Sequence, residues 1–388
     1  MRPVPNHIFD FTPETLREWC EAPPRRWPGF KAGQILEWVY KKHIVDPMAM
    51  TSLSKLERET LAREVAFLSG RVVREQTATD GTRKLLVEWE EGAGGGASVA
   101  AQRPVHAEAQ GHESNGDRRI ALLLPPTTGP QTECVMIPSV DPSGPRRTAC
   151  VSSQVGCPVG CKFCASGLGG LEGNLSAGRI VEQVWRLGTA RERISNVVFM
   201  GMGEPLANLP NVVRAVRTIA ALWGLGISAR KITISTVGLP QAIVKLAEQL
   251  ELPVTLALSL HAPNDELRRQ LIPWAQYTTI ADLLAACRAW FEKTGREITL
   301  EYTLLRGVND KPEHAVELAQ VARTLRANVN LIRYNEVDGL EFRRPRDEDV
   351  REFQRLLVAR NVNTHVRRSR GRDIAAACGQ LRHEATTA

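Results

Sequence analysis

From Ala149 to the end of this 388-residue chain, short apolar segments alternate with longer helical patterns, and this alternation limits the possible folds more than any other feature. The candidate strands are residues 149–153, 196–200, 231–235, 254–260, 298–305, 329–334 and 363–367. The candidate helices between them are Asn211–Leu222, Gln241–Leu250, Ile280–Lys293, Glu313–Arg326 and Asp347–Ala359. Strands that are apolar on both faces and separated by helices are typical of a parallel sheet with crossover helices. About six such units are fewer than the eight of a closed barrel. We therefore expect an α/β fold over residues 149–388, a partial (βα)6 TIM-like barrel with its active site at the carboxyl ends of the strands.

The first 75 residues have a helical pattern instead. Five apolar residues recur at the spacing of one helix face; they are Ala32, Ile35, Leu36, Val39 and Tyr40. A second helix is predicted over Leu53–Phe67, and lysines lie at the ends of the first. We expect an N-terminal helical accessory domain over residues 1–75, which either only packs against the barrel or docks a substrate.

Residues 76–148 are expected to form a small β-linker between these two parts. An Asp80–Gly81 turn signal separates two β-prone runs within residues 71–90. The stretch 92–132 is rich in glycine and polar residues, so we expect a flexible insertion in which only residues 120–124 could form a strand. The strand pattern is expected to resume at Glu133.

Composition excludes several classes of protein. The chain is 43% hydrophobic and 24% charged, which is ordinary for a globular protein and argues against disorder throughout. No apolar run approaches the roughly 18–20 residues of a membrane span, and the N-terminus lacks the apolar core of a secretory signal. Eight cysteines without such a signal indicate thiols in a reducing compartment rather than a disulfide scaffold. We expect a cytoplasmic protein without a membrane partner.

The formal net charge is +7, and the excess is concentrated near the C-terminus. Arg343–Arg372 contains ten arginines against four acidic residues. Such a concentration predicts a polyanion partner, since each phosphate that is neutralised releases counterions. A solvated helix face with a basic tail is the alternative. The candidate contacts to a polyanion are Arg367, Arg368 and Arg370.

Cys157, Cys161 and Cys164 are the residues that most constrain the chemistry. These three thiols, at C-x3-C-x2-C spacing on a glycine-rich loop after the first barrel strand, can converge on one centre. Thiolates are soft ligands that suit zinc or iron–sulfur centres. A structural zinc site normally has a fourth cysteine or histidine close in sequence, but the next candidates are His261 and Cys287. Three ligands therefore imply an open coordination position. The alternatives are a zinc site completed by a remote histidine, or buried thiols spaced by chance.

This loop resembles the cysteine loop of radical S-adenosylmethionine (SAM) enzymes, and nearly the whole chain resembles the RlmN/Cfr group of RNA adenine methyltransferases. The segments that carry the resemblance are GFKAGQILEWVYKK, TACVSSQVGCPVGCKFC, GNLSAGRIVEQV, FMGMGEPLAN, ITISTVG, LSLHAPND, IRYNEV and RRSRGRDIAAACGQL. The resemblance implies a radical SAM barrel whose three loop cysteines hold a 4Fe–4S cluster, with SAM on the fourth iron. It also implies SAM-binding positions at Gly203, Glu204, Ser235, Ser259, Leu260, His261 and Asn335. Read alone, such residues are typical of turns and caps.

Three further residues acquire a role only through this resemblance. Cys378 matches the cysteine that is methylated and then carries the methyl carbon to the RNA. Cys150 matches the thiol that resolves the covalent adduct by forming a disulfide with Cys378, and Glu133 matches the proton acceptor. Read alone, the two cysteines are typical of buried core thiols. Cys20 and Cys287 match no functional position and are expected to pack in the core.

The implied reaction uses two SAM molecules per turnover, because carbons C2 and C8 of adenine lack the nucleophilic character that polar methyl transfer needs. We expect methylation of C2 of an adenosine in 23S rRNA, and also of the adenosine next to the anticodon in tRNA. The expected enzyme is a monomer that uses an external electron donor of flavodoxin or ferredoxin type and holds RNA through Arg367, Arg368 and Arg370.

Two other functions stay open at this point. A Cfr-like or diverged paralogue would methylate C8 or another RNA, and a non-catalytic RNA-binding protein would hold a structural metal. The sequence departs from the usual pattern in its long 92–132 segment, in a slightly long loop between Glu133 and Cys150, and in Arg333, where the group typically has a proline. None of these departures removes a residue with an implied catalytic role, but loops of this kind set which substrate fits.

Overall fold

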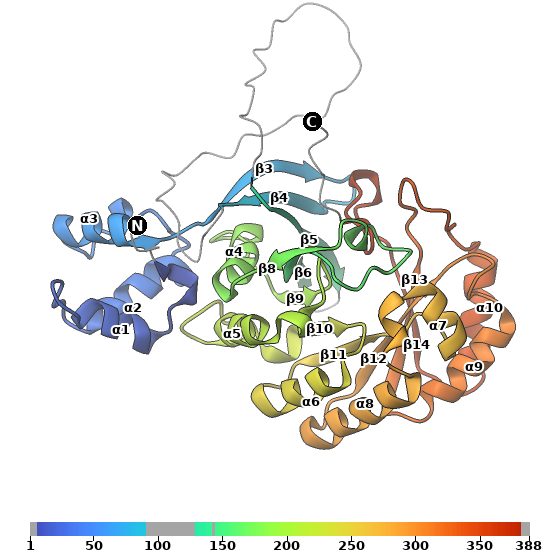
Figure 1. The fold of residues 1–388 in the computed structure, drawn as a ribbon. Coiled ribbons are helices and arrows are strands. Elements are labelled where there is room, and N and C mark those ends of the chain that lie inside the picture. Colours follow the sequence, from blue (N-terminus) through green and yellow to red (C-terminus); the bar gives the residue numbers. More distant parts are fainter. Residues whose placement is uncertain (1–5, 91–128, 142–143, 382–388) are drawn as a thin grey trace, which may run out of the picture.

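The computed structural model describes residues 6–90, 129–141 and 144–381 of the chain. One ten-stranded sheet runs through this part, in the order β14-β13-β12-β11-β10-β9-β6-β5-β4-β3 (Figure 1). Its parallel strands are β6 (Gly144–Cys150), β9 (Asn196–Phe199), β10 (Ile232–Thr236), β11 (Thr255–Ser259), β12 (Ile298–Leu304), β13 (Ala327–Arg333) and β14 (Thr364–Arg367). Each strand of this series pairs in parallel with the one named after it. The predicted parallel sheet is therefore confirmed.

Helices connect these strands, and all but one lie along the outer face of the sheet (Figure 1). They are α4 (Ala177–Leu187), α5 (Leu209–Ala220), α6 (Pro240–Gln249), α7 (Asp265–Leu271), α8 (Ile280–Thr294), α9 (Pro312–Ala322) and α10 (Asp347–Val358). The exception is α7, which lies beside the cysteine loop, where Lys162 N donates to Leu271 O (3.0 Å). In β11 the consecutive residues Leu256, Ala257 and Leu258 are all fully buried, as a strand covered on both faces requires. Within the described residues, the terminal strands β14 and β3 do not pair with each other. The barrel is thus partial, as expected.

The β-linker extends the same sheet beyond β6. Strands β3 (Gly70–Thr77), β4 (Arg83–Trp89) and β5 (Gln131–Asp141) follow in antiparallel order. The predicted Asp80–Gly81 turn joins β3 to β4, with Gly81 at a φ of 80° that glycine adopts without strain. Strand β5 begins two residues before Glu133, where we expected it to resume, because Gln131 and Thr132 pair with Glu88 and Val87 of β4. Residues 92–128 of the expected insertion, including 120–124, lie outside the described residues.

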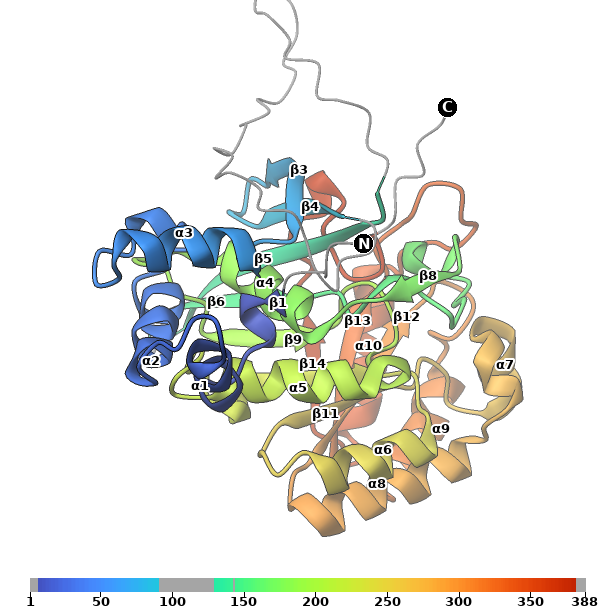
Figure 2. The same cartoon turned by 60° about the vertical axis from the view of Figure 1, so that its left-hand side comes forward.

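The N-terminal residues form a helical module against the start of the barrel (Figure 2). It consists of β1 (Asn6–His7), α1 (Pro13–Glu21), α2 (Phe30–Leu36), α3 (Lys55–Glu64) and β2 (Val65–Ala66). All five residues of the predicted apolar stripe are buried; the last two lie in a π-helical turn that continues α2. The second helix ends at Glu64 rather than at Phe67, because Val65 and Ala66 pair with β1. No helix in the described part of the chain is long and apolar enough to span a membrane.

Candidate functional site

A small hairpin holds the cysteine loop at the carboxyl end of β6. Strands β7 (Gln154–Gly156) and β8 (Leu171–Asn174) pair around it, and Cys157 N donates to Gly170 O (2.8 Å). Gly156 has a φ of 74°, and a Cβ at this position would lie 2.0 Å from Gly170 O. Only glycine fits there, so the glycine-rich sequence around the cysteines serves to close the loop tightly.

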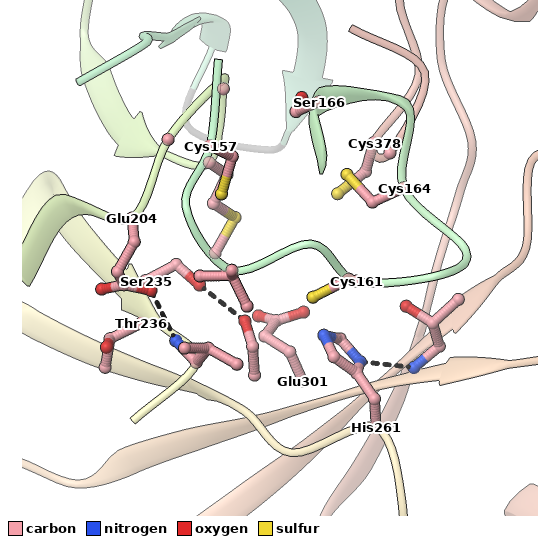
Figure 3. Close-up of a pocket in the computed structure, with 18 of the residues that line it drawn as sticks. Cys157, Cys161, Cys164, Ser166, Glu204, Ser235, Thr236, His261, Glu301 and Cys378 are labelled. Atoms are coloured by element: carbon pink, nitrogen blue, oxygen red, sulfur yellow. Dashed lines mark hydrogen bonds between the residues drawn. The ribbon is translucent and has the colours of Figure 1, made fainter. Parts of the chain in front are cut away.

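The three predicted cluster cysteines line one pocket at the carboxyl ends of the barrel strands (Figure 3). Burial raises the pKa of Cys157 to about 12 and also raises the pKa of Cys161 and Cys164. Without bound cations, the three thiols in this pocket therefore favour their neutral form. Bound cations would stabilise the thiolates. This donor set, with its three thiols and no fourth protein ligand nearby in sequence, fits a cluster that keeps one coordination position open.

A single metal ion does not fit the same arrangement. Among the described residues, no group of three cysteine, histidine, aspartate or glutamate side chains could hold one ion. The alternative of a zinc site completed by a remote histidine therefore has no ligand set in that part of the chain. A 4Fe–4S cluster does not need its thiolates to converge on one atom, because each cysteine binds a different iron.

Five of the seven predicted SAM positions line the same pocket: Gly203, Glu204, Ser235, Ser259 and His261. Glu204 is buried, and its carboxylate accepts hydrogen bonds from Leu206 N (2.9 Å) and Val237 N (2.8 Å). It therefore joins the segment after β9 to the segment after β10. Gly203 has a φ of 99° and packs against Ser153 and Gln154, so that no side chain fits between the loop and this wall.

The other three positions in the pocket come from β10 and β11. The hydroxyls of Ser235 and Ser259 lie 3.1 Å apart. His261 follows β11 at a φ of 57°, and its Nδ1 accepts a hydrogen bond from Thr303 N (3.1 Å). Burial, together with the nearby Arg268 guanidinium, lowers the pKa of His261 to about 3. The imidazole is therefore neutral at physiological pH, with Nε2 as its donor atom.

Leu260 and Asn335 do not line this pocket among the described residues. Leu260 is fully buried, and its backbone N donates to Glu301 O (3.1 Å). Asn335 lines a second, neighbouring pocket, and its Nδ2 donates to Cys378 O (3.2 Å). Asn335 thus contacts the segment that carries Cys378.

Cys378 is exposed and lines both pockets. Its segment rests on the cysteine loop, because Ala165 N donates to Gly379 O (2.9 Å) and Ser166 Oγ donates to Leu381 O (2.6 Å). Figure 3 shows the sulfurs of Cys164 and Cys378 side by side. The chain therefore brings residue 378 back to the cysteine loop near residue 164.

Cys150 lies beneath this segment at the end of β6. It is buried in an apolar cluster with Val135, Met202, Ala376 and Leu381. Burial raises the pKa of its thiol to about 12, and the charge of the Cys378 thiolate would raise it further. Cys150 and Cys378, which the family resemblance pairs, are more than 200 positions apart in the sequence but near neighbours in the structure.

Glu133 is buried on β5 and lines neither of these two pockets. Its Oε1 lies 2.7 Å from Lys84 Nζ of β4. Ser152 Oγ donates to the Glu133 carbonyl (2.6 Å). Its role as a proton acceptor stays a prediction, now with a buried cation beside the carboxylate.

The basic stretch divides into two kinds of arginine. Arg367, Arg368 and Arg370 line the second pocket together with Arg146. By contrast, Arg346 and Arg355 on and next to α10 form ion pairs with carboxylates on the same helix. Arg333, the residue at the usual proline position, forms an ion pair with Asp347 (3.3 Å). The three pocket arginines of this stretch line the same pocket as Cys378, and Arg370 also forms an ion pair with Asp80 (3.8 Å).

Sequence reasoning missed several residues of the first pocket and its wall. Arg268 of α7 is fully buried and donates to Leu260 O (3.2 Å) and Val237 O (2.5 Å), which joins the segments after β10 and β11. Glu301 lines the pocket and accepts two hydrogen bonds from Asn330. Tyr334 also lines it, and its buried hydroxyl has no hydrogen-bond partner among the described residues, as a group aimed at a polar ligand would. For Glu301 the sequence did offer a signal, namely a glutamate inside the apolar strand pattern ITLEYTLL.

Comparison with known proteins assigns two parts of the chain to known families. Residues 151–319 match the radical SAM superfamily, and residues 6–67 match the ribosomal RNA large subunit methyltransferase N-terminal domain. A probable dual-specificity RNA methyltransferase RlmN from Thermosynechococcus vestitus is 43% identical over 95% of both chains. The dual-specificity RNA methyltransferase RlmN of Syntrophobacter fumaroxidans is 40% identical over 96% of this chain and 97% of its own. The crystal structure of a radical SAM methyltransferase from Sphaerobacter thermophilus matches with a TM-score of 0.84 and 39% identity, over 97% of this chain and 99% of that one.

Proposed function

The chain belongs to the RlmN family of radical SAM RNA methyltransferases, and we propose that it methylates carbon C2 of an adenosine in 23S rRNA and of the adenosine next to the anticodon in tRNA. It is an enzyme of the radical SAM type, which uses a 4Fe–4S cluster and SAM. We also propose that the enzyme is a monomer and that an external one-electron donor of flavodoxin or ferredoxin type reduces it.

The observation that carries the proposal is the position of Cys378 between two pockets. One pocket contains the three loop cysteines and five of the SAM positions, and the other contains four arginines. A carrier of one carbon has to face both the source of the methyl group and the base that receives it. An exposed thiol shared by a thiol-rich pocket and a basic pocket meets this requirement.

The proposed chemistry follows from what adenine C2 lacks. This carbon is not nucleophilic, so it cannot displace a methyl group from the sulfonium of SAM. Bound at Cys157, Cys161 and Cys164, the cluster together with SAM supplies one-electron chemistry that activates a C–H bond. The protein's own residues then carry the carbon: Cys378 holds it as a thioether, and Glu133 accepts the proton that leaves the modified base.

Release of the product needs a second thiol. The Cys378 sulfur, once bonded to the carbon on the base, can leave only if another nucleophile attacks it. The Cys150 sulfur forms the new S–S bond, the S–C bond breaks, and the electron pair of that bond takes up a proton to complete the methyl group. A disulfide formed in this way is transient and catalytic, as is usual in a reducing compartment.

The second pocket suits an unstacked nucleotide. An adenine modified on its edge has to leave the stack to reach a pocket, and single-stranded RNA segments are the usual targets of sequence-specific proteins. Arg146, Arg367, Arg368 and Arg370 supply cations for the flanking phosphates.

The test uses anaerobically purified, cluster-reconstituted protein with SAM, a reductant and protein-free 23S rRNA or tRNA. The RNA is digested and its nucleosides are compared by mass spectrometry with 2-methyl- and 8-methyladenosine standards. We expect 2-methyladenosine from both RNAs, and none from the Cys378→Ala variant. An 8-methyl product would assign the chain to the Cfr-like reaction, and SAM cleavage without a methylated adenosine would overturn the proposed substrate.

A further inference from the structure

Lys84 forms a buried ion pair with the proposed proton acceptor. Its Nζ lies 2.7 Å from Glu133 Oε1, and the two side chains are only 8% and 5% exposed. Strands β4 and β5 are antiparallel, with Lys84 directly opposite Val135. Residue 133 is therefore its diagonal neighbour on the same face of the sheet, which is within reach of a long side chain.

The same ammonium reaches the segment that carries Cys378. Lys84 Nζ donates to the carbonyl of Ala375 (3.3 Å). Ala375 has a φ of 49°, a left-handed conformation that costs energy for a residue with a Cβ and persists only where surrounding contacts enforce it. One cation thus connects the carboxylate on β5 with the backbone three residues before the carrier cysteine.

The turn between β3 and β4 also holds this segment. Asp80 Oδ2 accepts a hydrogen bond from Gly371 N (3.1 Å), and Thr79 N donates to Asp373 Oδ2 (2.9 Å). A Cβ added to Gly371 would lie 2.8 Å from Thr82 Cγ2, which shows how closely the two segments pack. In Figure 1 the C-terminal segment, in red, lies against the ends of β3 and β4. The β3–β4 hairpin and residues 371–378 therefore form one unit.

Stability alone does not explain a buried pair at this place. Removing two charges from water costs free energy that their attraction only partly offsets, and apolar residues of similar size often replace such pairs without loss. A carboxylate that has to accept a proton, however, must be held at one place, and a buried cation paired with it fixes its position.

We propose that Lys84 is a positioning residue for methyl transfer: its ammonium fixes the position of the Glu133 carboxylate and holds it in register with the Cys378 segment. This inference rests on the proposed function, because Lys84 acts through a residue that is assigned as the proton acceptor. The N-terminal half of the β-linker thereby becomes part of the catalytic arrangement rather than a connection.

The first experiment compares Lys84→Met with Lys84→Arg and with the control Arg83→Met. Arg83 is the neighbouring cation on β4, on the opposite face, where it forms an ion pair with Glu75 (3.4 Å) and donates to Leu187 O (2.6 Å). The readout is the ratio of methyladenosine to 5′-deoxyadenosine in the reconstituted enzyme. We expect Lys84→Met to lower this ratio at least about tenfold, since a positioned base contributes roughly 100- to 10,000-fold. Lys84→Arg should retain most of it, and Arg83→Met should match the wild type.

A double-mutant comparison separates this role from general damage. If Lys84 acts through Glu133, Lys84→Met should lower the product ratio no further in a Glu133→Gln background. A wild-type enzyme that forms no methyladenosine would overturn the proposed function and this inference together. An active wild type with an unchanged ratio in Lys84→Met would overturn the inference alone.

A second experiment uses the protein without its cluster. Hydrogen–deuterium exchange is measured for residues 371–378, where Ala376 N donates to Gly371 O (2.8 Å). Lys84→Met should speed exchange in this segment by about tenfold or more, because it removes a contact that stabilises the closed loop. Arg83→Met should leave the segment unchanged. Equal exchange in the wild type and Lys84→Met would show that Lys84 does not hold the segment.

Discussion

At the residue scale, the two thiols near the basic pocket differ in exposure. Cys378 is exposed, whereas Cys150 is buried beneath it; desolvation raises the pKa of both thiols, that of Cys150 to about 12. A neutral buried thiol is a poor nucleophile and is protected from oxidants. This difference suits a carrier that meets the RNA and a resolving thiol that acts only after the carrier is loaded.

Replacing Cys150 should therefore stop the reaction after the carbon has reached the RNA. In Cys150→Ala we expect a covalent protein–RNA adduct through Cys378, because no thiol remains to displace the sulfur. Denaturing electrophoresis with labelled RNA would detect the adduct, and nuclease digestion followed by peptide mass spectrometry would locate it at residue 378. Free methyladenosine should fall to about 1% of wild type or less, the scale of a lost covalent step.

Cys134 provides the matched control for this variant. It is a fully buried thiol on the neighbouring strand β5, and burial also raises its pKa. Cys134→Ala should form no adduct and should retain methylation. An adduct in both variants, or in neither, would contradict the role of Cys150.

At the scale of secondary structure elements, Glu182 of α4 joins the N-terminal module to the β-linker and the barrel. It is completely buried and accepts hydrogen bonds from His7 Nε2 (2.9 Å), Ser69 N (2.8 Å), Gly70 N (3.1 Å) and Arg186 Nε (2.7 Å). Although burial opposes its charge, Arg186, His7 and the backbone donors lower its pKa from 4.5 to about 2. One carboxylate thus connects β1, β3 and α4.

We expect Glu182→Ala to lower the free energy of unfolding by about 3–5 kcal/mol, since it leaves several buried donors without a partner. Chemical denaturation of the wild type and the variant measures this loss. Glu59→Ala, which removes a carboxylate that is paired with Lys55 on the exposed face of α3 in the N-terminal module, should cost about 1 kcal/mol or less. Equal losses in the two variants would contradict the connecting role of Glu182.

The lowered pKa of Glu182 also predicts the pH dependence of stability. A carboxylate whose pKa is lower in the folded state stabilises that state fully above about pH 4.5 and progressively less as the pH falls toward 2. Between these limits the wild type should lose about 3 kcal/mol that Glu182→Gln does not lose. Denaturation curves at several pH values measure the difference, and parallel pH profiles would contradict it.

The sequence predicted the elements that depend on local pattern. The apolar segments of the barrel strands and the stripe from Ala32 to Tyr40 required only the periodicity of one strand or one helix. Helix α4 was missed although its pattern is regular, because its interior includes the buried polar residues Glu182 and Gln183. Their partners lie on other elements, as with Ser152, which is bonded to Gln183.

Much of the site was predictable from motifs rather than from the periodicity of apolar residues. The three loop cysteines signal a metal centre by spacing alone, whereas Cys378 and Cys150 acquired roles only through the resemblance to a family. Lys84 and Arg268 gave no signal at all, because a buried cation is recognised by its partners. The carboxylate partner of Lys84 is Glu133, which lies 49 residues away, across the insertion. The partners of Arg268 lie on the segments after β10 and β11.

At the scale of the whole molecule, the net charge of +7 does not act uniformly. Arg355 of α10 is paired with a carboxylate on its own helix, Glu352 at 2.7 Å. The arginines that line the second pocket come from β6, from the end of β14 and from the segment after it, and the exposed Cys378 lines the same pocket. Binding of RNA should therefore depend on a few cations at the pocket rather than on the total charge.

Salt dependence of RNA binding distinguishes these two possibilities. Each phosphate contact contributes a slope of about −0.7 to −0.9 to the logarithm of affinity against the logarithm of salt concentration. Replacing the exposed pocket residue Arg368 by glutamine should weaken RNA binding and make this slope shallower by roughly one such contact. Arg355→Gln removes the same charge from the same basic stretch, but its guanidinium is already paired with Glu352, so both affinity and slope should stay at wild-type values. Fluorescence anisotropy with labelled tRNA at several salt concentrations measures both quantities. If the two variants lose affinity equally, RNA binding responds to net charge, and the pocket is not the place where the RNA is held. If only Arg368→Gln loses affinity, the phosphates lie beside Cys378, where the methyl carbon has to be delivered.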